Sequence, residues 1–282
     1  MKKIIKWLTI IFIFLLLLII YARYIGPSGF ITKEYTIKDV SLPKSFDGLK
    51  IVHFSDLHYN RAISIDKVNK IVAEINLINP DIVVFTGDLI DKDVNLTNKD
   101  YSDLSKSLSN INSKYGKYAV MGNHDYYKDK DKIIDIYTNS NFKYLDNNND
   151  LIYSKENEVI FIGGINTLSY NMDDLDKTME YFNNHSDDIF KIILVHEPDI
   201  TDKIVNNYNV NLILAGHSHN GQIRLPIIGA IYTPKYSKKY YDNYYKIDNT
   251  NLYISSGIGF STINYRLWNK PSINFYRINK EA

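Results

Sequence analysis

Apolar and polar residues alternate along this chain in two distinct periods, which predict strands and helices in turn. Short apolar runs that are typical of buried strands occupy residues 51–54, 82–85, 118–121, 192–195 and 212–214. Further strands are expected at 142–145, 151–153, 159–162, 222–225, 252–255 and 273–278, with a turn at 147–149. Helical spacing predicts helices over 65–79, 99–115 and 172–183, the first ending before Pro80. The alternation predicts one α/β domain.

The N-terminal pattern differs, because residues 7–22 form an apolar run in which Thr9 is the only clearly polar member. As a helix this run spans about 24 Å, and Ile4 and Ile5 extend it toward the ~30 Å of a hydrocarbon core. Lysines precede the run and Arg23 follows it, so the positive-inside bias predicts a cytoplasmic N-terminus and an extracytoplasmic body.

We therefore expect a transmembrane anchor at 1–24, a linker and first strand at 25–47, and the main domain at 48–282. A signal peptide that is cleaved and releases the body stays open as an alternative, although no A-x-A site follows the run. A buried soluble helix fits least, because the run has no polar face.

Charge and composition narrow the function. The formal net charge is +1, but without residues 1–24 the chain has 29 basic and 32 acidic residues. This mildly acidic body gives no electrostatic basis for binding nucleic acid. Cysteine is absent, which excludes disulfides, thiolate ligands and a cysteine nucleophile.

Five of the seven histidines lie in four short blocks, each directly after a predicted strand. The blocks are Asp56-Leu57-His58, Gly122-Asn123-His124-Asp125, Val195-His196-Glu197 and Gly216-His217-Ser218-His219, and Gly87-Asp88 adds a carboxylate. Oxygen and nitrogen ligands without sulfur suit a hydrolytic centre for divalent metals. Because ligands bind at the carboxyl ends of strands, we expect the blocks to meet at one edge of a sheet.

The same blocks, in this order, resemble the calcineurin-like metallophosphoesterase family over roughly residues 48–278. The resemblance implies a sandwich of two mixed β-sheets flanked by helices. It also implies two divalent cations, with Asp56, His58 and His219 on one, Asn123, His196 and His217 on the other, and Asp88 bridging them. A hydroxide between the cations would then attack phosphorus.

By the same resemblance, His124 is a catalytic histidine that does not bind metal, and we expect Asp125 to orient its ring. Gly87, Gly122 and Gly216 are expected to allow tight turns near the metals. His53 fits a buried, hydrogen-bonded histidine better than a ligand, and His185 fits a solvated loop.

The anchor and the segment 216–226 are similar to a membrane-associated bacterial branch that includes enzymes similar to UDP-2,3-diacylglucosamine pyrophosphatases. Arg224 and Arg266 are candidate phosphate contacts, with structural salt bridges as the equal alternative. Residues 232–246, rich in Tyr and Lys, fit either an exposed loop or a contact with lipid headgroups.

We thus expect a membrane-anchored phosphoesterase that hydrolyses phosphodiester, phosphomonoester or pyrophosphate bonds. The cofactors would be Mn²⁺, Fe²⁺/Fe³⁺ or Zn²⁺, since availability decides among these for such ligands. Lipid-linked and cell-wall-associated phosphoesters are both open as substrates. The alternative is a membrane-tethered metal-binding protein with the same fold and little turnover.

Overall fold

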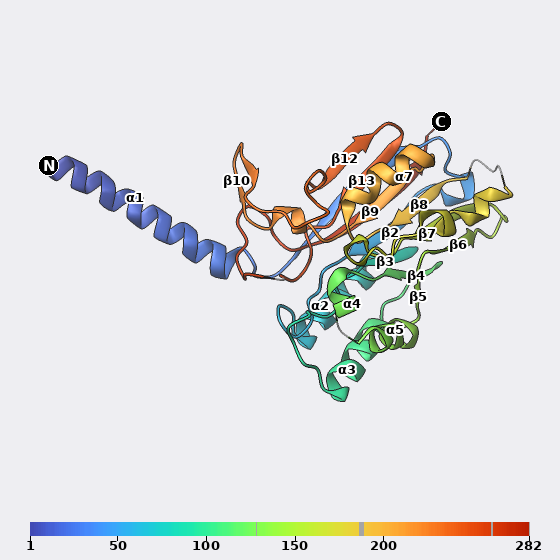
Figure 1. The fold of residues 1–282 in the computed structure, drawn as a ribbon, viewed down its shortest axis with the longest axis horizontal. Coiled ribbons are helices and arrows are strands. Elements are labelled where there is room, and N and C mark those ends of the chain that lie inside the picture. The colour runs from blue at the N-terminus through green and yellow to red at the C-terminus, as the bar shows by residue number, and fades with distance from the viewer. Residues whose placement is uncertain (128, 186–188, 261, 282) are drawn as a thin grey trace.

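The chain folds as a sandwich of two six-stranded mixed sheets with helices on the outer faces (Figure 1). The computed structural model describes residues 1–127, 129–185, 189–260 and 262–281. One apolar helix projects from this body at the N-terminus. The layers confirm the fold class that the resemblance implied.

The first sheet has the strand order β1-β14-β2-β3-β4-β5. Its strands are β1 (Ile31–Asp39), β14 (Ser272–Lys280), β2 (Leu49–Phe54), β3 (Ile82–Thr86), β4 (Gly116–Val120) and β5 (Phe142–Tyr144). β2 to β5 run parallel, and β14 pairs antiparallel with β2. Because β2, β3 and β4 are buried on nearly every residue, they read in the sequence as continuous apolar runs.

The second sheet has the order β12-β13-β9-β8-β7-β6. Its strands are β12 (Tyr244–Ile247), β13 (Thr250–Ile254), β9 (Leu212–Ala215), β8 (Lys191–Leu194), β7 (Val159–Gly164) and β6 (Asn148–Tyr153). The four central strands are parallel, and the edge strands β12 and β6 are antiparallel to their neighbours. A separate hairpin pairs β10 (Arg224–Leu225) with β11 (Gly229–Ala230).

Helices form the outer layers. On the first sheet these are α2 (Ile65–Ile78), α3 (Asn98–Ser109) and α5 (Lys130–Asn139), and on the second α6 (Leu175–Thr178) and α7 (Thr201–Asn207). The short α4 (Asn123–Tyr127) follows β4 directly. Single turns of 3₁₀ helix lie at Lys44–Phe46, Leu168–Tyr170, Glu180–Asn183, Pro198–Ile200 and His219–Gly221.

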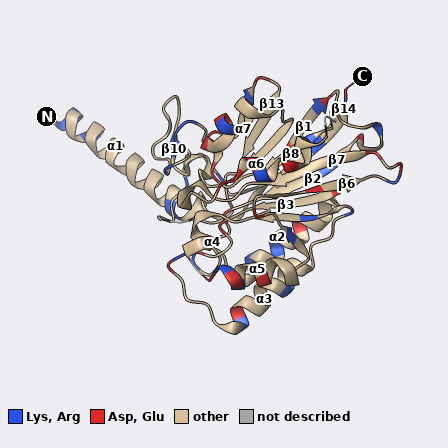
Figure 2. Ribbon diagram, turned by 45° about the vertical axis from the view of Figure 1, so that its right-hand side comes forward, with Lys and Arg blue, Asp and Glu red and all other residues tan. Residues whose placement is uncertain are grey.

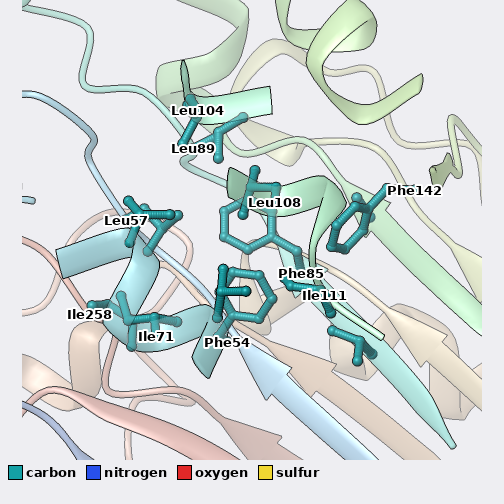
Figure 3. Packing of buried hydrophobic residues seen from close by; sticks show 14 of the residues in the cluster. Phe54, Leu57, Ile71, Phe85, Leu89, Leu104, Leu108, Ile111, Phe142 and Ile258 are labelled. Atoms are coloured by element: carbon teal, nitrogen blue, oxygen red, sulfur yellow. The ribbon is translucent and has the colours of Figure 1, made fainter. Parts of the chain in front are cut away.

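Apolar side chains fill three layers, one between the sheets and one under each set of helices. Under α2 and α3, the rings of Phe54 and Phe85 lie 4.9 Å apart between centroids and pack with Ile71 and Leu108 (Figure 3). These buried layers fix the sheets against each other, and therefore fix the loops at the ends of their strands.

The apolar N-terminal segment forms α1 (Lys2–Ile20) and continues as one π-helical turn, Tyr21–Ile25. No residue of α1 is buried, and the helix is long and apolar enough to cross a membrane. Lys and Arg lie toward its two ends, with no acidic residue between them (Figure 2).

Several predicted elements differ in extent. The helix expected over 99–115 ends at Ser109, and Nζ of Lys117 donates to the carbonyl oxygens of Leu108 in its last turn and of Ile111 beyond it. The helix expected over 172–183 divides into α6 and a 3₁₀ turn. The turn expected at 147–149 lies earlier, since Asn148 already belongs to β6 and Asn147 holds the left-handed φ of 49°. The loop expected at 232–246 contains the start of β12, an edge strand that pairs with the following strand β13 across a short turn.

Candidate metal centre

All five predicted ligand blocks meet at one place, but they come from the ends of strands in both sheets. β2, β3 and β4 of the first sheet deliver Asp56, His58, Asp88 and Asn123, and β8 and β9 of the second deliver His196, His217 and His219. The expectation of a single sheet edge was therefore wrong. The sequence could not show this, because it records that a strand is buried and not which sheet it joins.

The loops that carry the ligands have unusual backbone geometry. Asp56, His58, Asp88, His217 and His219 all have positive φ angles, between 44° and 64°. Residues other than glycine adopt this region rarely, and such strain gathers at functional sites where the surrounding structure enforces it.

Two glycines let these loops approach each other. A Cβ on Gly122 would lie 2.2 Å from Oδ1 of Asp88, and one on Gly87 would lie 2.4 Å from the backbone nitrogen of Gly122. Gly87 also has a φ of +91°, which side chains disfavour. The loops after β3 and β4 can therefore touch only because both positions lack a side chain.

The ligand atoms form two adjoining groups around Asp88. Asp56, His58 and His219 make one group, with Nε2 of His219 at 3.4 Å from Oδ1 of Asp56. Asp88, His196 and His217 make the second, with Nδ1 of His217 at 3.2 Å from Nε2 of His196. Oδ2 of Asp88 lies 3.4 Å from Nε2 of His196 and 3.7 Å from Nε2 of His58, so this carboxylate faces both groups.

The outward nitrogens of the histidines have partners that orient the rings. Nδ1 of His196 lies 2.6 Å from the carbonyl oxygen of Thr86, and Nε2 of His217 lies 2.8 Å from that of Lys235. A carbonyl can only accept, so each of these nitrogens carries the proton and the inward nitrogen presents its lone pair. This is the state in which a histidine binds a metal.

Unpartnered atoms at the centre fit divalent cations. In the described part of the chain, Nε2 of His58 and Oδ1 of Asn123 are buried without a hydrogen-bond partner. Buried polar atoms are rarely left without a partner, and those that are often coordinate a bound ion. The oxygen and nitrogen donors, the pairing around Asp88 and these atoms together fit two cations.

The ionisation states of Asp88 and His219 also fit bound cations. Burial disfavours ionisation of Asp88, but the rings of His196, His124 and His58 outweigh it and hold the pKa of this carboxyl well below its usual range. Burial also lowers the pKa of His219 well below its usual value, so that ring stays neutral. An ionised carboxylate among buried imidazoles is an arrangement that a cation stabilises.

His124 lines the cleft, as expected, but Asp125 does not orient its ring. The carboxylate of Asp125 accepts backbone N–H groups of Gly122 at 3.0 Å, Asp88 at 2.9 Å and Leu89 at 2.8 Å. Consecutive helical residues point about 100° apart, so the side chains of His124 and Asp125 diverge on α4. Asp125 instead holds the loops after β3 and β4 together.

Asp91, which the sequence reasoning missed, lies where Asp125 was expected. Its Oδ2 lies 3.3 Å from Nδ1 of His58 and 3.5 Å from Nδ1 of His124, and the residue is fully buried. Burial disfavours a proton on His124, but Asp88 and Asp91 outweigh it and raise the pKa of that ring. The only signal in the sequence was an aspartate three residues after Asp88.

Arg224 and Arg266, the two candidate phosphate contacts, both bind groups within the protein. Arg266 is fully buried and donates to the carbonyl oxygens of Ser256 at 2.8 Å and Gly259 at 2.7 Å. Arg224 pairs with Asp242 at 2.5 Å and donates to the carbonyl oxygen of Asn220. Arg224 thus makes an ion pair of the kind the alternative expected, whereas Arg266 makes hydrogen bonds to carbonyl oxygens, and a phosphate contact by either stays a prediction.

The remaining histidines follow expectation. His53 is fully buried, with Nε2 at 2.8 Å from the Thr86 hydroxyl and Nδ1 at 3.3 Å from the Tyr276 hydroxyl. His185 is exposed and stacks on the ring of Tyr181.

A cleft of about 470 Å³ opens over the centre. Its floor includes Asp88, Asn123, His124, His217 and His219. One wall is largely apolar and comes from the hairpin region and the loop before β14, with Ile223, Ile231, Tyr232, Pro234 and Ile263. The ligand atoms are thus reachable from solvent on one side.

Known proteins match this chain in sequence and fold. A family model described as calcineurin-like phosphoesterase matches residues 49–221. The uncharacterized metallophosphoesterase YkuE of Bacillus subtilis is 34% identical over 92% of this chain and 88% of its own length. A transmembrane protein with metallophosphoesterase domain from Danio rerio is 27% identical over 82% of this chain, which spans 53% of that protein.

Among solved structures, a 5'-nucleotidase precursor from Thermus thermophilus superposes with a TM-score of 0.50 at 14% identity. That alignment covers 82% of this chain and 54% of the nucleotidase, and it speaks for the fold alone. The family model spans more than half of the chain, and YkuE matches nearly all of it. The chain therefore belongs to the calcineurin-like phosphoesterase family and is a hydrolase of the metallophosphoesterase type.

Proposed function

We propose that the protein is a membrane-anchored phosphoesterase that works with two divalent cations. Asp56, His58 and His219 would hold one cation, Asn123, His196 and His217 would hold the other, and Asp88 would be shared. The observation that carries this proposal is the position of Asp88, whose Oδ2 faces a ring nitrogen of each group at 3.4 and 3.7 Å. Two cations close together repel, so they need an anionic bridge.

When bound, the cations supply Lewis acidity, which polarises phosphoryl oxygens and lowers the pKa of a bound water. The protein's own side chains position the substrate and supply a proton to the leaving oxygen. His124 borders the cleft and its raised pKa keeps a proton available, so it is positioned to donate that proton to the leaving oxygen. Asp91 supports it by holding a negative charge beside the ring.

The membrane part of the proposal rests on α1. Its length, its apolar surface and the lysines in its first turns support an uncleaved anchor with the N-terminus in the cytoplasm and the catalytic domain outside. A cleaved signal would give the same compartment for the domain without the anchor. Mass determination of the protein from membranes separates the two, because cleavage removes about 2–3 kDa.

For the substrate, we propose a phosphoester whose leaving group has an apolar portion. The apolar wall of the cleft, with Ile223 and Ile231, supports this, since apolar ligand surface gains free energy against such a wall. A lipid-linked phosphoester or pyrophosphate has this chemistry. Simple diesters and monoesters remain suitable test substrates because the cations act on the phosphoryl group alone.

The test uses the full chain in detergent with Mn²⁺ and bis-p-nitrophenyl phosphate or p-nitrophenyl phosphate. We expect hydrolysis, two metal ions per chain by elemental analysis, and a rate at least ~100-fold lower for Asp88→Asn and for His124→Ala. His185→Ala is the matched control, because that histidine is exposed and away from the cleft.

Each outcome is decisive for one part of the proposal. Two bound metals without turnover on any phosphoester would favour a metal-binding protein of the same fold. A single bound metal would refute the shared role of Asp88. Unchanged turnover in His124→Ala would remove that residue from the chemistry.

A further inference from the structure

The hairpin of β10 and β11 exposes an unusual apolar tip. Ile227 is 107% exposed and Ile228 is 71% exposed. The N–H of Ile228 donates to the carbonyl oxygen of Pro226 at 2.8 Å, which closes a three-residue turn around Ile227 with φ at 71°. Glycine or asparagine normally takes such a position, and a β-branched residue there is strained. In water the tip thus combines backbone strain with exposed apolar surface.

The base of this hairpin is tied to the end of the N-terminal helix. Arg224 donates its backbone N–H to the carbonyl oxygen of Leu267 at 3.0 Å. The next residue back, Arg266, donates its backbone N–H to the carbonyl oxygen of Ala22 at 2.8 Å. Figures 1 and 2, which view the molecule from two directions, both show β10 beside the end of α1.

We propose that the tip Pro226–Ile228 enters the interface of the same bilayer that α1 crosses, as a second membrane contact. This inference rests on the proposed anchoring of α1. The bilayer is the occupant that the structure favours, because the tip lies on the side of the body from which α1 leaves. The base of its hairpin is also joined, through residues 266 and 267, to Ala22 in the turn that follows α1.

Neighbouring residues suit the same surface. Tyr232 follows the hairpin and is 69% exposed, and Trp268 follows Leu267 and is 54% exposed. Tyr and Trp are the residues enriched at membrane interfaces. A cavity of about 240 Å³ at the end of α1 is lined by Arg23 and Lys67, which supply positive charge where lipid phosphates would lie.

Docking of the tip would fix how far the cleft lies from the bilayer surface. Ile223 and Ile231 flank the hairpin and also belong to the apolar wall that leads to the metal ligands. With the tip in the interface, this wall would begin at the bilayer surface. A substrate could then pass from the membrane to the cleft without exposing its apolar part to water.

The test measures how deep single labelled positions lie in a bilayer, using the full chain. Because the chain has no cysteine, Ile227→Cys, Phe12→Cys and Leu77→Cys each give one site for an environment-sensitive fluorophore. Phe12 reports the anchor. Leu77 is the matched control, an 81% exposed apolar residue at the end of α2 that leads into β3, opposite the ligand-bearing strand ends. The protein is reconstituted into phosphatidylcholine and phosphatidylglycerol vesicles with or without nitroxide-labelled lipid.

We expect strong quenching at position 12, and quenching at 227 several-fold greater than at 77. Quenching at 12 with none at 227 would overturn the docking inference and leave the anchor in place. No quenching at 12 would contradict the anchoring itself. Disulfide formation between two copies through position 227, without quenching by lipid, would assign the tip to self-association and also overturn the inference. Ile228→Cys repeats the measurement should a label at 227 disturb the turn.

Discussion

Replacing Asp91 by Asn tests whether a buried carboxylate outside the ligand set controls the centre. The Oδ2 of Asp91 lies 3.3 Å from Nδ1 of His58 and 3.5 Å from Nδ1 of His124. Its Oδ1 accepts from Arg61 at 3.0 Å and from the backbone N–H of Asp93 at 2.9 Å. Asparagine has the same shape, so it can keep the Oδ1 contacts while its NH₂ group takes the place of Oδ2.

The size of the effect follows from that exchange. An amide NH₂ only donates, and it would face the Nδ1–H of His58, which must keep its proton for Nε2 to bind a cation. Loss of a carboxylate beside a metal-binding histidine commonly lowers metal affinity or activity ~10–100-fold. We therefore expect kcat/KM to fall ~10–100-fold, with a higher Mn²⁺ concentration needed for half-maximal rate.

The assay is hydrolysis of bis-p-nitrophenyl phosphate over a series of Mn²⁺ concentrations. Asp93→Asn is the matched control, because the side chain of Asp93 is 57% exposed and also pairs with Arg61. The control should keep its rate within about twofold, as an exposed ion pair contributes little. If Asp91→Asn matched the wild type in both kcat/KM and metal dependence, the role given to this carboxylate would be wrong.

Three further results are expected. Gly122→Ala should displace Asp88, since the new Cβ would lie 2.2 Å from its Oδ1, and calorimetric titration with Mn²⁺ should show the loss of at least one binding event. Lys117→Met should lower the free energy of unfolding by about 1–3 kcal/mol in urea unfolding, because Nζ of Lys117 satisfies carbonyls of Leu108 and Ile111 at the end of α3. Lys99→Met on the exposed face should leave the unfolding midpoint nearly unchanged. Burial lowers the pKa of His53 from its ordinary value of 6.5 to about 3, so below pH 6.5 the unfolded chain binds a proton that the folded chain refuses. Stability is therefore lost as the pH falls from 6.5 toward 3, and His53→Gln should show a smaller drop between about pH 7 and about pH 5 in EDTA; an equal drop would contradict the assignment.

The strands that carry the ligands could be predicted from sequence because each is buried on both faces and ends at a polar or glycine residue. Asp56 and Asp88 follow neighbouring strands of one sheet, so the rule that ligands gather at carboxyl ends predicts that they meet, whereas His196 arrives from the second sheet. Their division between two sheets could not be predicted, since it depends on β8 and β9 pairing with β7 and β13 and not with β2 to β4.

The contacts that the sequence did not reveal at Asp125 and Arg266 are made with backbone groups. Asp125 accepts N–H groups from two loops, and Arg266 donates to carbonyls of residues 256 and 259. Backbone partners leave no mark in the sequence, because every residue offers them. Asp91 was hidden for a related reason, as one of many aspartates in the chain with no characteristic spacing to His124.

Both proposed cation sites draw ligands from the two halves of the sandwich, and this joins metal content to mechanical integrity. Each ion would act as a cross-brace, with oxygen donors such as Asp56 on one side and His217 or His219 on the other. A ligand present at 100 times its dissociation constant adds about 2.7 kcal/mol to the folded state. Chelation should accordingly weaken the contact between the two sheets before it disturbs the strand pairing within either. Metal starvation of the cell would then remove both the activity and part of the protein's stability against unfolding.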